Sequence, residues 1–360
     1  MRHLTAVGRT AGLAGAIAIA IGAGGCAAPP PLEEWTLGLE EVMTIGAEPV
    51  SLQTAFYIPM TMGFDFEGNV FVLDSGNHRV QMFSPEGEYI RSLGAAGAGP
   101  GDLGDPQGMF VHPDGRVWVA DTRNRRIQPY GIDGTPADPL TLEFFPADVV
   151  VTDDRLFVRR LPQTSLVYGP DPAPLVAVLD HDGRPTGGFV DPVASPVGML
   201  YMLENLLAMS PAPGGGIAVS NTHFSSRIRV YRAGGQLEIE IPVLYKAGAW
   251  APLGRRPIDV NEASLDRLAR TASDLAWDER RHLFWVLAGY VDRTTEGEWV
   301  IGHEIYRYSP DGTYRGSLML PHRATTVATG PDGRIWTIDV DGVVHAFRLT
   351  DPDMEPLDGS

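Results

Sequence analysis

The sequence predicts an all-β protein in which six four-stranded antiparallel sheets form a closed ring, a six-bladed β-propeller. Three observations carry this prediction. A strand–turn–strand segment occurs twice, at residues 68–81 and 115–128. Short strands with alternating patterns recur behind turn signals along the whole chain, and the last unit ends before its fourth strand. Units that bury their apolar faces only against their neighbours require a continuous array.

Each predicted unit is recognised by the residue that opens its second strand. These residues are Val70, Val117, Leu156, Ile217, Leu283 and Ile335. A turn signal precedes each one, for example Pro-Asp-Gly at 113–115, and an alternating run follows, for example Val-Trp-Val at 117–119. Six such positions predict six blades.

The sixth unit predicts how the ring closes. Its third strand covers 345–349, and only an acidic, proline-broken tail follows. We therefore expect residues 39–45, ahead of the first blade, to supply the missing strand and remove both exposed edges. Among the long connections between blades, 243–273 contains a segment with a cap and helical spacing at 261–272, which predicts a short helix between blades 4 and 5.

The N-terminus has the layout of an export signal. Arg2 and Arg9 precede an apolar, small-residue run at 11–25, which ends at Cys26. Residues 23–26 resemble a bacterial lipobox, which implies that Cys26 becomes the lipidated first residue of an envelope protein. A plain cleaved signal and an uncleaved anchor are the alternatives. The predicted organisation is a signal peptide at 1–25, a proline-rich tether at 26–34, the propeller at 35–352 and an acidic tail at 353–360.

The two repeated segments resemble NHL repeats, whose pattern is roughly G-N-[VIL]-[YFW]-V-x-D-x-x-N-x-R-[VI]-Q. The whole chain is similar to the six-bladed propellers found among bacterial lipoproteins. The resemblance implies the fold and does not name a ligand.

Composition excludes some partners. The 360 residues carry a formal charge of −17, which argues against nucleic acid and against an anionic membrane surface. The single cysteine lies at the predicted lipidation site, so the exported domain would have no disulfide. We expect a monomer that contacts the membrane only through its lipid.

Basic side chains gather in the loops between second and third strands. Asn77 and Asn124 are expected to hold their turns, while Arg79 and Arg126 pair with the aspartates that end the preceding strands. Arginine binds carboxylate or phosphate through two parallel hydrogen bonds, which favours an anionic ligand at this face. The candidate ligand-binding residues are His78, Arg123, Arg125, His223 and Arg227, together with Gln107 and Asn205 from the inner strands.

Polar residues are also predicted to line the mouth of the central channel. Alignment of the inner strands places Gln107, Asn205, Ser273 and Thr325 in one register, with Asp148 and Asp274 in the next. The two aspartates are weak candidates for a Ca²⁺ site, since that ion takes oxygen ligands. Solvated channel lining is the alternative, and we expect no cofactor.

Two families of propeller enzymes have site motifs that this sequence lacks. Amidating lyases acting on peptidyl-hydroxyglycine have NHL-like blades with histidine zinc ligands, one in a Pro-His-Ser segment, but residues 106–108 read Pro-Gln-Gly. His112 and His181 lie in turns without zinc-site spacing. Gluconolactonase-like propellers use a glutamate in the first inner strand, and residues 60–64 contain none.

The sequence therefore predicts an exported, lipid-anchored binding or interaction module without a catalytic residue. Its expected partner is a cell-envelope protein, a peptide or a small anionic ligand. The alternative is a hydrolase or lyase with its site at the channel mouth.

Overall fold

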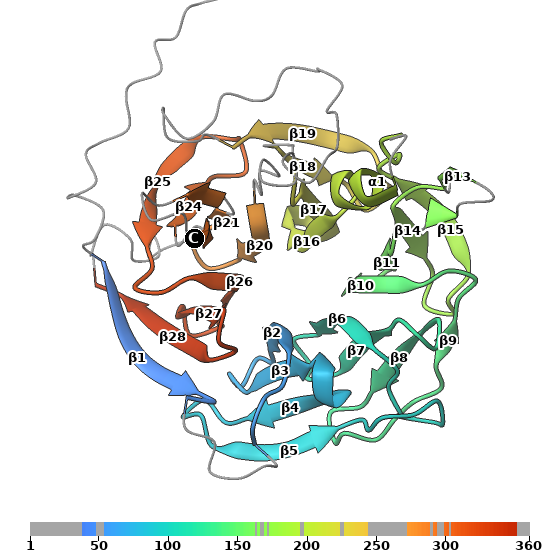
Figure 1. Cartoon of the computed structure of the whole chain (residues 1–360), viewed down its shortest axis with the longest axis horizontal. Coiled ribbons are helices and arrows are strands. Elements are labelled where there is room, and N and C mark those ends of the chain that lie inside the picture. The colour runs from blue at the N-terminus through green and yellow to red at the C-terminus, as the bar shows by residue number, and fades with distance from the viewer. Residues whose placement is uncertain are drawn as a thin grey trace, which may run out of the picture. The chain divides into compact units, whose positions relative to one another are not determined.

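Six four-stranded antiparallel sheets, the blades, follow one another along the chain (Figure 1). The computed structural model describes residues 38–47, 54–162, 164–165, 169–170, 173–194, 198–223, 227–243, 272–288, 291–293, 299–301 and 304–350. The predicted signal peptide, tether, helix at 261–272 and acidic tail lie outside these residues, apart from Ala272.

The first strand of each blade is its inner strand, and the fourth is its outer strand. Blades 1 to 3 are β2 (Pro59–Phe64), β3 (Val70–Asp74), β4 (Arg79–Phe83) and β5 (Tyr89–Leu93); β6 (Pro106–Val111), β7 (Val117–Asp121), β8 (Arg126–Tyr130) and β9 (Leu140–Thr141); and β10 (Pro146–Val151), β11 (Leu156–Arg160), β14 (Val176–Leu179) and β15 (Pro185–Phe189). Blades 4 to 6 are β16 (Leu207–Ala212), β17 (Gly216–Asn221), β18 (Arg227–Tyr231) and β19 (Leu237–Pro242); β20 (Ala272–Asp278), β21 (Leu283–Ala288), β24 (Glu304–Tyr308) and β25 (Tyr314–Met319); and β26 (Ala324–Thr329), β27 (Ile335–Asp339), β28 (Val344–Leu349) and β1 (Leu39–Ile45).

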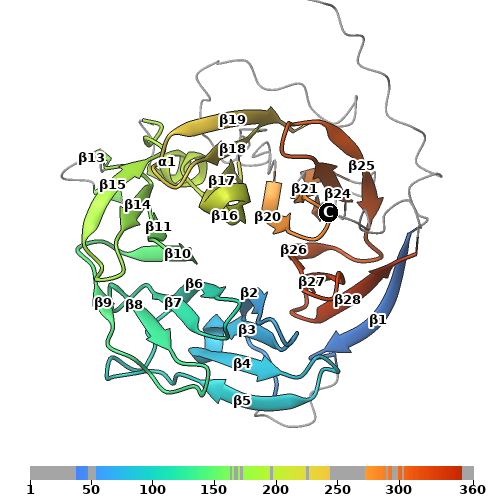
Figure 2. The ribbon, with the colours of Figure 1, turned by 180° about the vertical axis from the view of Figure 1, so that it is seen from behind.

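The blades form a ring because their inner strands contact one another in sequence, from β2 through β6, β10, β16, β20 and β26 and back to β2. Figures 1 and 2 show these inner strands around the centre and the outer strands at the perimeter. The ring closes as predicted. β1 pairs with β28, from Leu39 opposite Leu349 to Ile45 opposite Val344, so the N-terminal strand completes blade 6.

The apolar core lies between blades. Within the described residues it comprises six buried clusters, one at each interface between neighbouring blades. Successive side chains of a strand point to opposite faces of its sheet. In β3, Val70 and Val72 therefore enter the cluster against blade 6, while Phe71 and Leu73 enter the cluster against blade 2. This explains why second strands such as β3 and β7 are buried along their whole length.

Small elements depart from the expectations. A helix, α1 (Gly198–Glu204), lies between blades 3 and 4, where the sequence analysis expected only a long connection. Two short ribbons, β12 (Thr164–Ser165) with β13 (Gly169–Pro170) and β22 (Val291–Arg293) with β23 (Trp299–Ile301), lie in the loops between the second and third strands of blades 3 and 5. Their strands have two or three residues, which is too short for a periodic pattern. None of the helices in the described part of the chain has the length and apolarity needed to cross a bilayer.

Candidate functional site

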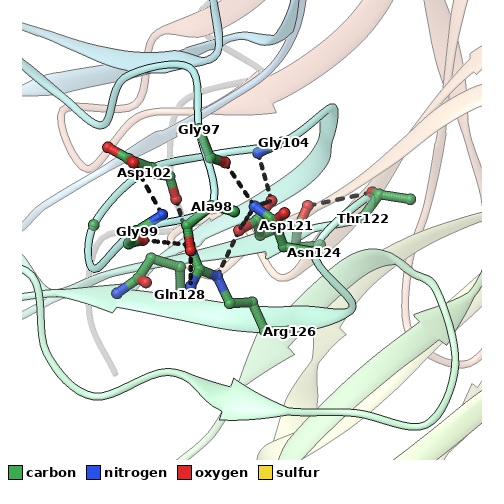
Figure 3. A network of polar contacts seen from close by, with 12 residues as sticks. Gly97, Ala98, Gly99, Asp102, Gly104, Asp121, Thr122, Asn124, Arg126 and Gln128 are labelled. Carbon is green, nitrogen blue, oxygen red and sulfur yellow. Dashed lines mark hydrogen bonds and ion pairs between the residues drawn. The ribbon is translucent and has the colours of Figure 1, made fainter.

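In each of the first two blades, the repeated motif holds the chain segment that leads into the inner strand. In the second copy, Asp121 accepts hydrogen bonds from the Gly104 N–H (2.6 Å), the Asn124 side chain (2.8 Å) and Arg126 Nε (2.6 Å) (Figure 3). Arg126 Nη2 also donates to the carbonyl oxygens of Gly99 (2.9 Å) and Asp102 (2.7 Å). The network ties the connection from blade 1 to the loop that follows β7.

The first copy repeats this arrangement. Asp74 accepts from the N–H groups of Tyr57 (2.9 Å) and Ile58 (3.2 Å), from Asn77 (2.7 Å) and from Arg79 Nε (3.1 Å). Both aspartates are fully buried. The predicted structural role of the motif is confirmed, because its polar groups bind one another and the backbone.

The predicted anion-binding residues in the loops are dispersed. His78 Nδ1 accepts the Asp105 N–H (3.1 Å), which fastens the next connection. Arg227 forms an ion pair with Glu240 on the neighbouring outer strand. Arg125 lies over the Phe145 ring at 5.7 Å, and Arg123 is exposed to solvent. Their role in binding a ligand stays a prediction.

Asn205 and His223 do come together, in a small pocket of about 220 Å³ between blades 3 and 4. The Asn205 amide is engaged with backbone, since it accepts the Val193 N–H (2.7 Å) and donates to the carbonyls of Val193 (3.0 Å) and Tyr201 (2.7 Å). His223 is buried and its Nδ1 lies 2.8 Å from Thr222 Oγ1. The arrangement of Asn205 serves to hold the connection that carries α1.

A shared irregularity sets the register of the inner strands. In five of the described inner strands the pairing shifts by one residue, at Met60, Gln107, Ala147, Ser273 and Thr325. β16 has no such shift, so Asn205 does not share the position of Gln107. Asp148 and Asp274 are each the residue after a bulge. The bulge re-aims the side chain that follows it, and the two carboxylates occupy equivalent places on blades 3 and 5.

A cavity of about 910 Å³ occupies the centre of the ring. Its walls come from the inner strands, beginning at the level of Thr61, Asp148 and Asp274. Its rim comes from the turns between first and second strands, including His112, Asp154, Gly215 and Glu279. The cavity thus opens at the face opposite the loops between second and third strands, where the sequence analysis placed the candidate basic residues.

The floor of the cavity is the end lined by Thr61, Asp148 and Asp274, and the charges of the ionisable groups there influence one another's pKa values. Burial raises the pKa of Asp148 to about 6, although the positive charge of Arg159 and the hydrogen bond from the Val149 N–H oppose the rise. Burial raises the pKa of Asp274 to about 7, and the negative charge of Asp148 adds to the rise. The N–H groups of Leu275 (2.9 Å) and Val327 (3.0 Å) donate to the Asp274 carboxylate and oppose it.

Arg159 joins this pair from the second strand of blade 3. It lies opposite Asp148 in the β10–β11 register, and its Nη2 donates to the Ala147 carbonyl (2.9 Å). Burial lowers the pKa of Arg159, while the charges of both aspartates counteract that fall. Arg159 was not among the candidate residues of the sequence analysis, which considered basic side chains in the loops, whereas Arg159 lies in the strand β11 and interacts with both carboxylates.

Gly108 makes the close packing at the floor possible. A Cβ atom at this position would lie 2.5 Å from Asp148 Cα and 2.5 Å from Asp148 Oδ1. Gly108 is the blade 2 residue equivalent to Asp148, so a side chain here would displace the carboxylate. Within the described residues, no group of three or more His, Cys, Asp or Glu side chains is arranged to hold a metal ion.

Fold and site together define a six-bladed propeller with a cavity of ligand size. A family model, DUF5128, described as "6-bladed beta-propeller", matches residues 64–161, from the end of β2 to just beyond β11. The fold implied by the NHL-like repeats is shown, while membership of that repeat family stays a prediction. A comparison with curated proteins finds no match.

Three solved structures are similar in fold. A member of the duf4221 family from Bacteroides vulgatus is 13% identical with a TM-score of 0.58, covering 87% of this chain and 99% of that one. A Bacteroides fragilis protein described as a "Putative exported protein" is 11% identical with a TM-score of 0.54, covering 87% and 96%. A catalytically inactive virginiamycin B lyase from Staphylococcus aureus, with quinupristin, is 12% identical with a TM-score of 0.50, covering 84% and 83%. At these identities the likeness concerns the fold alone.

Proposed function

We propose that this protein is an exported propeller that binds a small molecule or a peptide side chain in its central cavity. The observation that carries the proposal is the cavity of about 910 Å³ with Asp148 and Asp274 at its floor. Ligand sites in proteins are typically hollows of roughly 300–1,000 Å³ with apolar walls and a few convergent polar groups. Ionisable groups with shifted pKa values cluster at such sites.

The loop face supports an anionic ligand less well. Arg79 and Arg126 are bound to buried aspartates, and Arg227 is paired with Glu240. Their charge is therefore largely neutralised within the fold. Arg123 and Arg125 are exposed and remain the candidates for contact with a carboxylate or phosphate of an envelope partner.

A variant that fills the cavity tests the proposal. Thr61 is the blade 1 residue equivalent to Asp148 and lines the floor. In Thr61→Trp the larger side chain should therefore fill the floor of the cavity. The matched control is Thr141→Trp, on the exposed outer strand of blade 2. The purified proteins are equilibrated with a small-molecule extract of the cell envelope, and retained compounds are identified by mass spectrometry. We expect retention by the parent and by Thr141→Trp but not by Thr61→Trp. Equal retention by all three proteins would contradict the proposal.

The second candidate is a hydrolase or lyase that uses the same floor. Carboxyl groups with pKa values of about 6 and about 7 can exchange protons near neutral pH, as a general acid and base must. The two functions are distinguished by the fate of a retained compound. A binding protein returns it chemically unchanged after prolonged incubation, whereas an enzyme converts it, and conversion should be lost in Asp274→Asn.

We also propose export and lipid anchoring through Cys26. The support is the sequence layout of residues 1–26, which lie outside the described residues. The parent protein should fractionate with membranes, and Cys26→Ala should appear in the soluble fraction. Unchanged membrane association of Cys26→Ala would exclude the lipid anchor.

A further inference from the structure

The mouth of the cavity is acidic on one side. Asp153 and Asp154 lie exposed on the β10–β11 turn, and Glu279 lies exposed on the β20–β21 turn. These turns belong to blades 3 and 5, the same blades that supply the two carboxylates at the floor. Negative charge therefore continues from rim to floor, and a cleft lined by one sign of charge concentrates ions of the other sign.

Blade 4 leaves a gap between the two acidic turns. Its own turn contains Gly214 and Gly215, and a Cβ atom added at either glycine would meet nothing within 4 Å. Both glycines line the cavity. Among the described residues, the acidic side is therefore open at this turn, and a ligand can approach between the two acidic turns.

The described basic residues of the lining are already engaged. His112 lies 2.8 Å from Asp114, and Arg280 Nη1 donates to the Pro331 carbonyl (2.9 Å). Asp65 and Asp278, two further carboxylates of the lining, are buried with partners of their own, Asn69 and Arg281. At the rim, Glu279 accepts a hydrogen bond from Trp277 Nε1, and at the floor Asp148 and Asp274 share the single guanidinium of Arg159. Carboxylates therefore outnumber their described cationic partners at both levels of the cavity.

The opposite side of the cavity is apolar and aromatic. Blade 1 contributes Phe64 and Phe66, and blade 2 contributes Met109 and Phe110. Phe66 is 65% exposed at the rim, although large apolar side chains are usually buried. Aromatic rings offer apolar contact to a ligand's body at little cost in conformational entropy.

We propose that the cavity binds an amphiphilic cation, with a protonated amine against Asp148 and Asp274 and an apolar body against the aromatic side of blades 1 and 2. This inference rests on the proposed function of the cavity and names the chemical class of its ligand. Two carboxylates and one guanidinium leave the floor with an excess negative charge when ionised. Burial makes that charge costly, and a bound ammonium group compensates it.

Binding should be coupled to the release of a proton. The cation favours the ionised form of both aspartates, so the proton that Asp274 holds near neutral pH passes to the buffer. At about pH 5 both floor carboxyls are mostly protonated and the amine should bind weakly; at about pH 8 both are ionised and it should bind tightly. Among the described residues, Arg159 is the charged group that interacts electrostatically with both floor carboxyls.

Three probes that differ in one end group test the inference. These are 4-phenylbutylamine, 4-phenylbutan-1-ol and 4-phenylbutyrate, titrated calorimetrically into the purified full chain. The phenyl group is common to all three, and the end group is cationic, neutral or anionic. A hydrogen bond between charged groups stabilises a complex more than one between neutral groups. We therefore expect the amine to bind at least about tenfold more tightly than the alcohol, and the carboxylate to bind most weakly of the three. The enthalpy of amine binding should vary between buffers of different ionisation enthalpy.

Variants assign the effect to the floor. Asp274→Asn and Asp148→Asn should each weaken the amine by about tenfold or more and change the alcohol by less than about twofold. Asp138→Asn, at an exposed position ahead of β9, is the control and should change neither. Thermal unfolding confirms that each variant is folded, and the two floor variants serve as independent tests.

Each remaining outcome is decisive. If the alcohol or the carboxylate binds in the cavity as tightly as the amine, the inference is wrong while the proposed binding function stands. If none of the three probes binds saturably, the inference is wrong, while the proposed binding function is decided separately by the retention experiment with Thr61→Trp. If the amine binds equally well to the parent and both floor variants, the carboxylates do not recognise it and the inference is overturned.

Discussion

Aspartate performs two different tasks in this molecule, and its surroundings decide which. Asp74 and Asp121 are buried, and each accepts several hydrogen bonds, including one from an arginine. These two aspartates therefore hold the loops in place. Asp148 and Asp274 are half-buried at a cavity floor where burial raises the pKa of each carboxyl. The first pair is held by the fold, whereas the second lines the cavity that we propose as a ligand site.

Removal of a buried motif arginine should be strongly destabilising. Arg126→Ala would leave the Asp121 carboxylate buried without its charged partner, at a cost of about 3 kcal/mol in the free energy of unfolding. Arg116→Ala is the control, because its pair with Asp114 is exposed and worth about 0–1 kcal/mol. Chemical denaturation measures both, and equal effects would show that the motif does not fasten the blade.

The floor carboxylates should make stability depend on pH. Their pKa values in the folded state, about 6 and about 7, exceed the ordinary aspartate value of about 4, so the folded state binds protons more tightly than the unfolded state. Stability should therefore fall as pH rises from about 4 to about 7, with at most ~1.4 kcal/mol per pH unit for each group. In Asp274→Asn, the free energy of unfolding should change less steeply with pH, because only the Asp148 carboxyl still contributes to the slope. An unchanged slope in denaturation curves across this range would contradict the raised pKa.

At the level of elements, the closing strand was predictable while the helix was not. Residues 39–45 were expected to complete blade 6 because that blade lacked a strand, and β1 spans Leu39–Ile45. Five predicted second-strand openers begin their strands, and β17 begins one residue earlier, at Gly216. Helix α1 escaped prediction because its seven residues, Gly198–Glu204, begin with glycine and have no acidic residue in the first turn.

The closing strand should be a point of weakness. Ile45 is 5% exposed and packs into the cluster between blades 6 and 1. Ile45→Ala should lower the free energy of unfolding by about 3 kcal/mol through lost burial and a residual cavity. Thr44→Ala, at the exposed neighbouring position, should change it by less than about 0.5 kcal/mol. Similar values for both variants would mean that β1 contributes little to closure.

At the level of the whole molecule, the site was only partly predictable. The alignment of Asp148 with Asp274 follows from strand register, which a sequence pattern carries. The opening of the cavity does not follow from strand register, because it depends on how side chains from six inner strands fill the centre of the ring. The candidate basic residues lie in loops at one face, while the structure places the large cavity at the other face, beside the short turns between first and second strands.

The ring geometry also explains why an acidic pair can lie so deep. Six blade interfaces each hold their own apolar cluster, so the centre of the ring is not needed as core. Functional groups on the inner strands can therefore change without dismantling the fold.

The proposed role of Asp148 and Asp274 is to form a charge-sensitive binding floor. Its most direct test is an NMR titration of the aspartate carboxyl carbons, assigned with Asp148→Asn and Asp274→Asn, with and without 4-phenylbutylamine. We predict midpoints near pH 6 for Asp148 and near pH 7 for Asp274, and a shift of both to lower pH when the amine binds. Midpoints near the ordinary aspartate value of about 4, unmoved by the amine, would contradict the account.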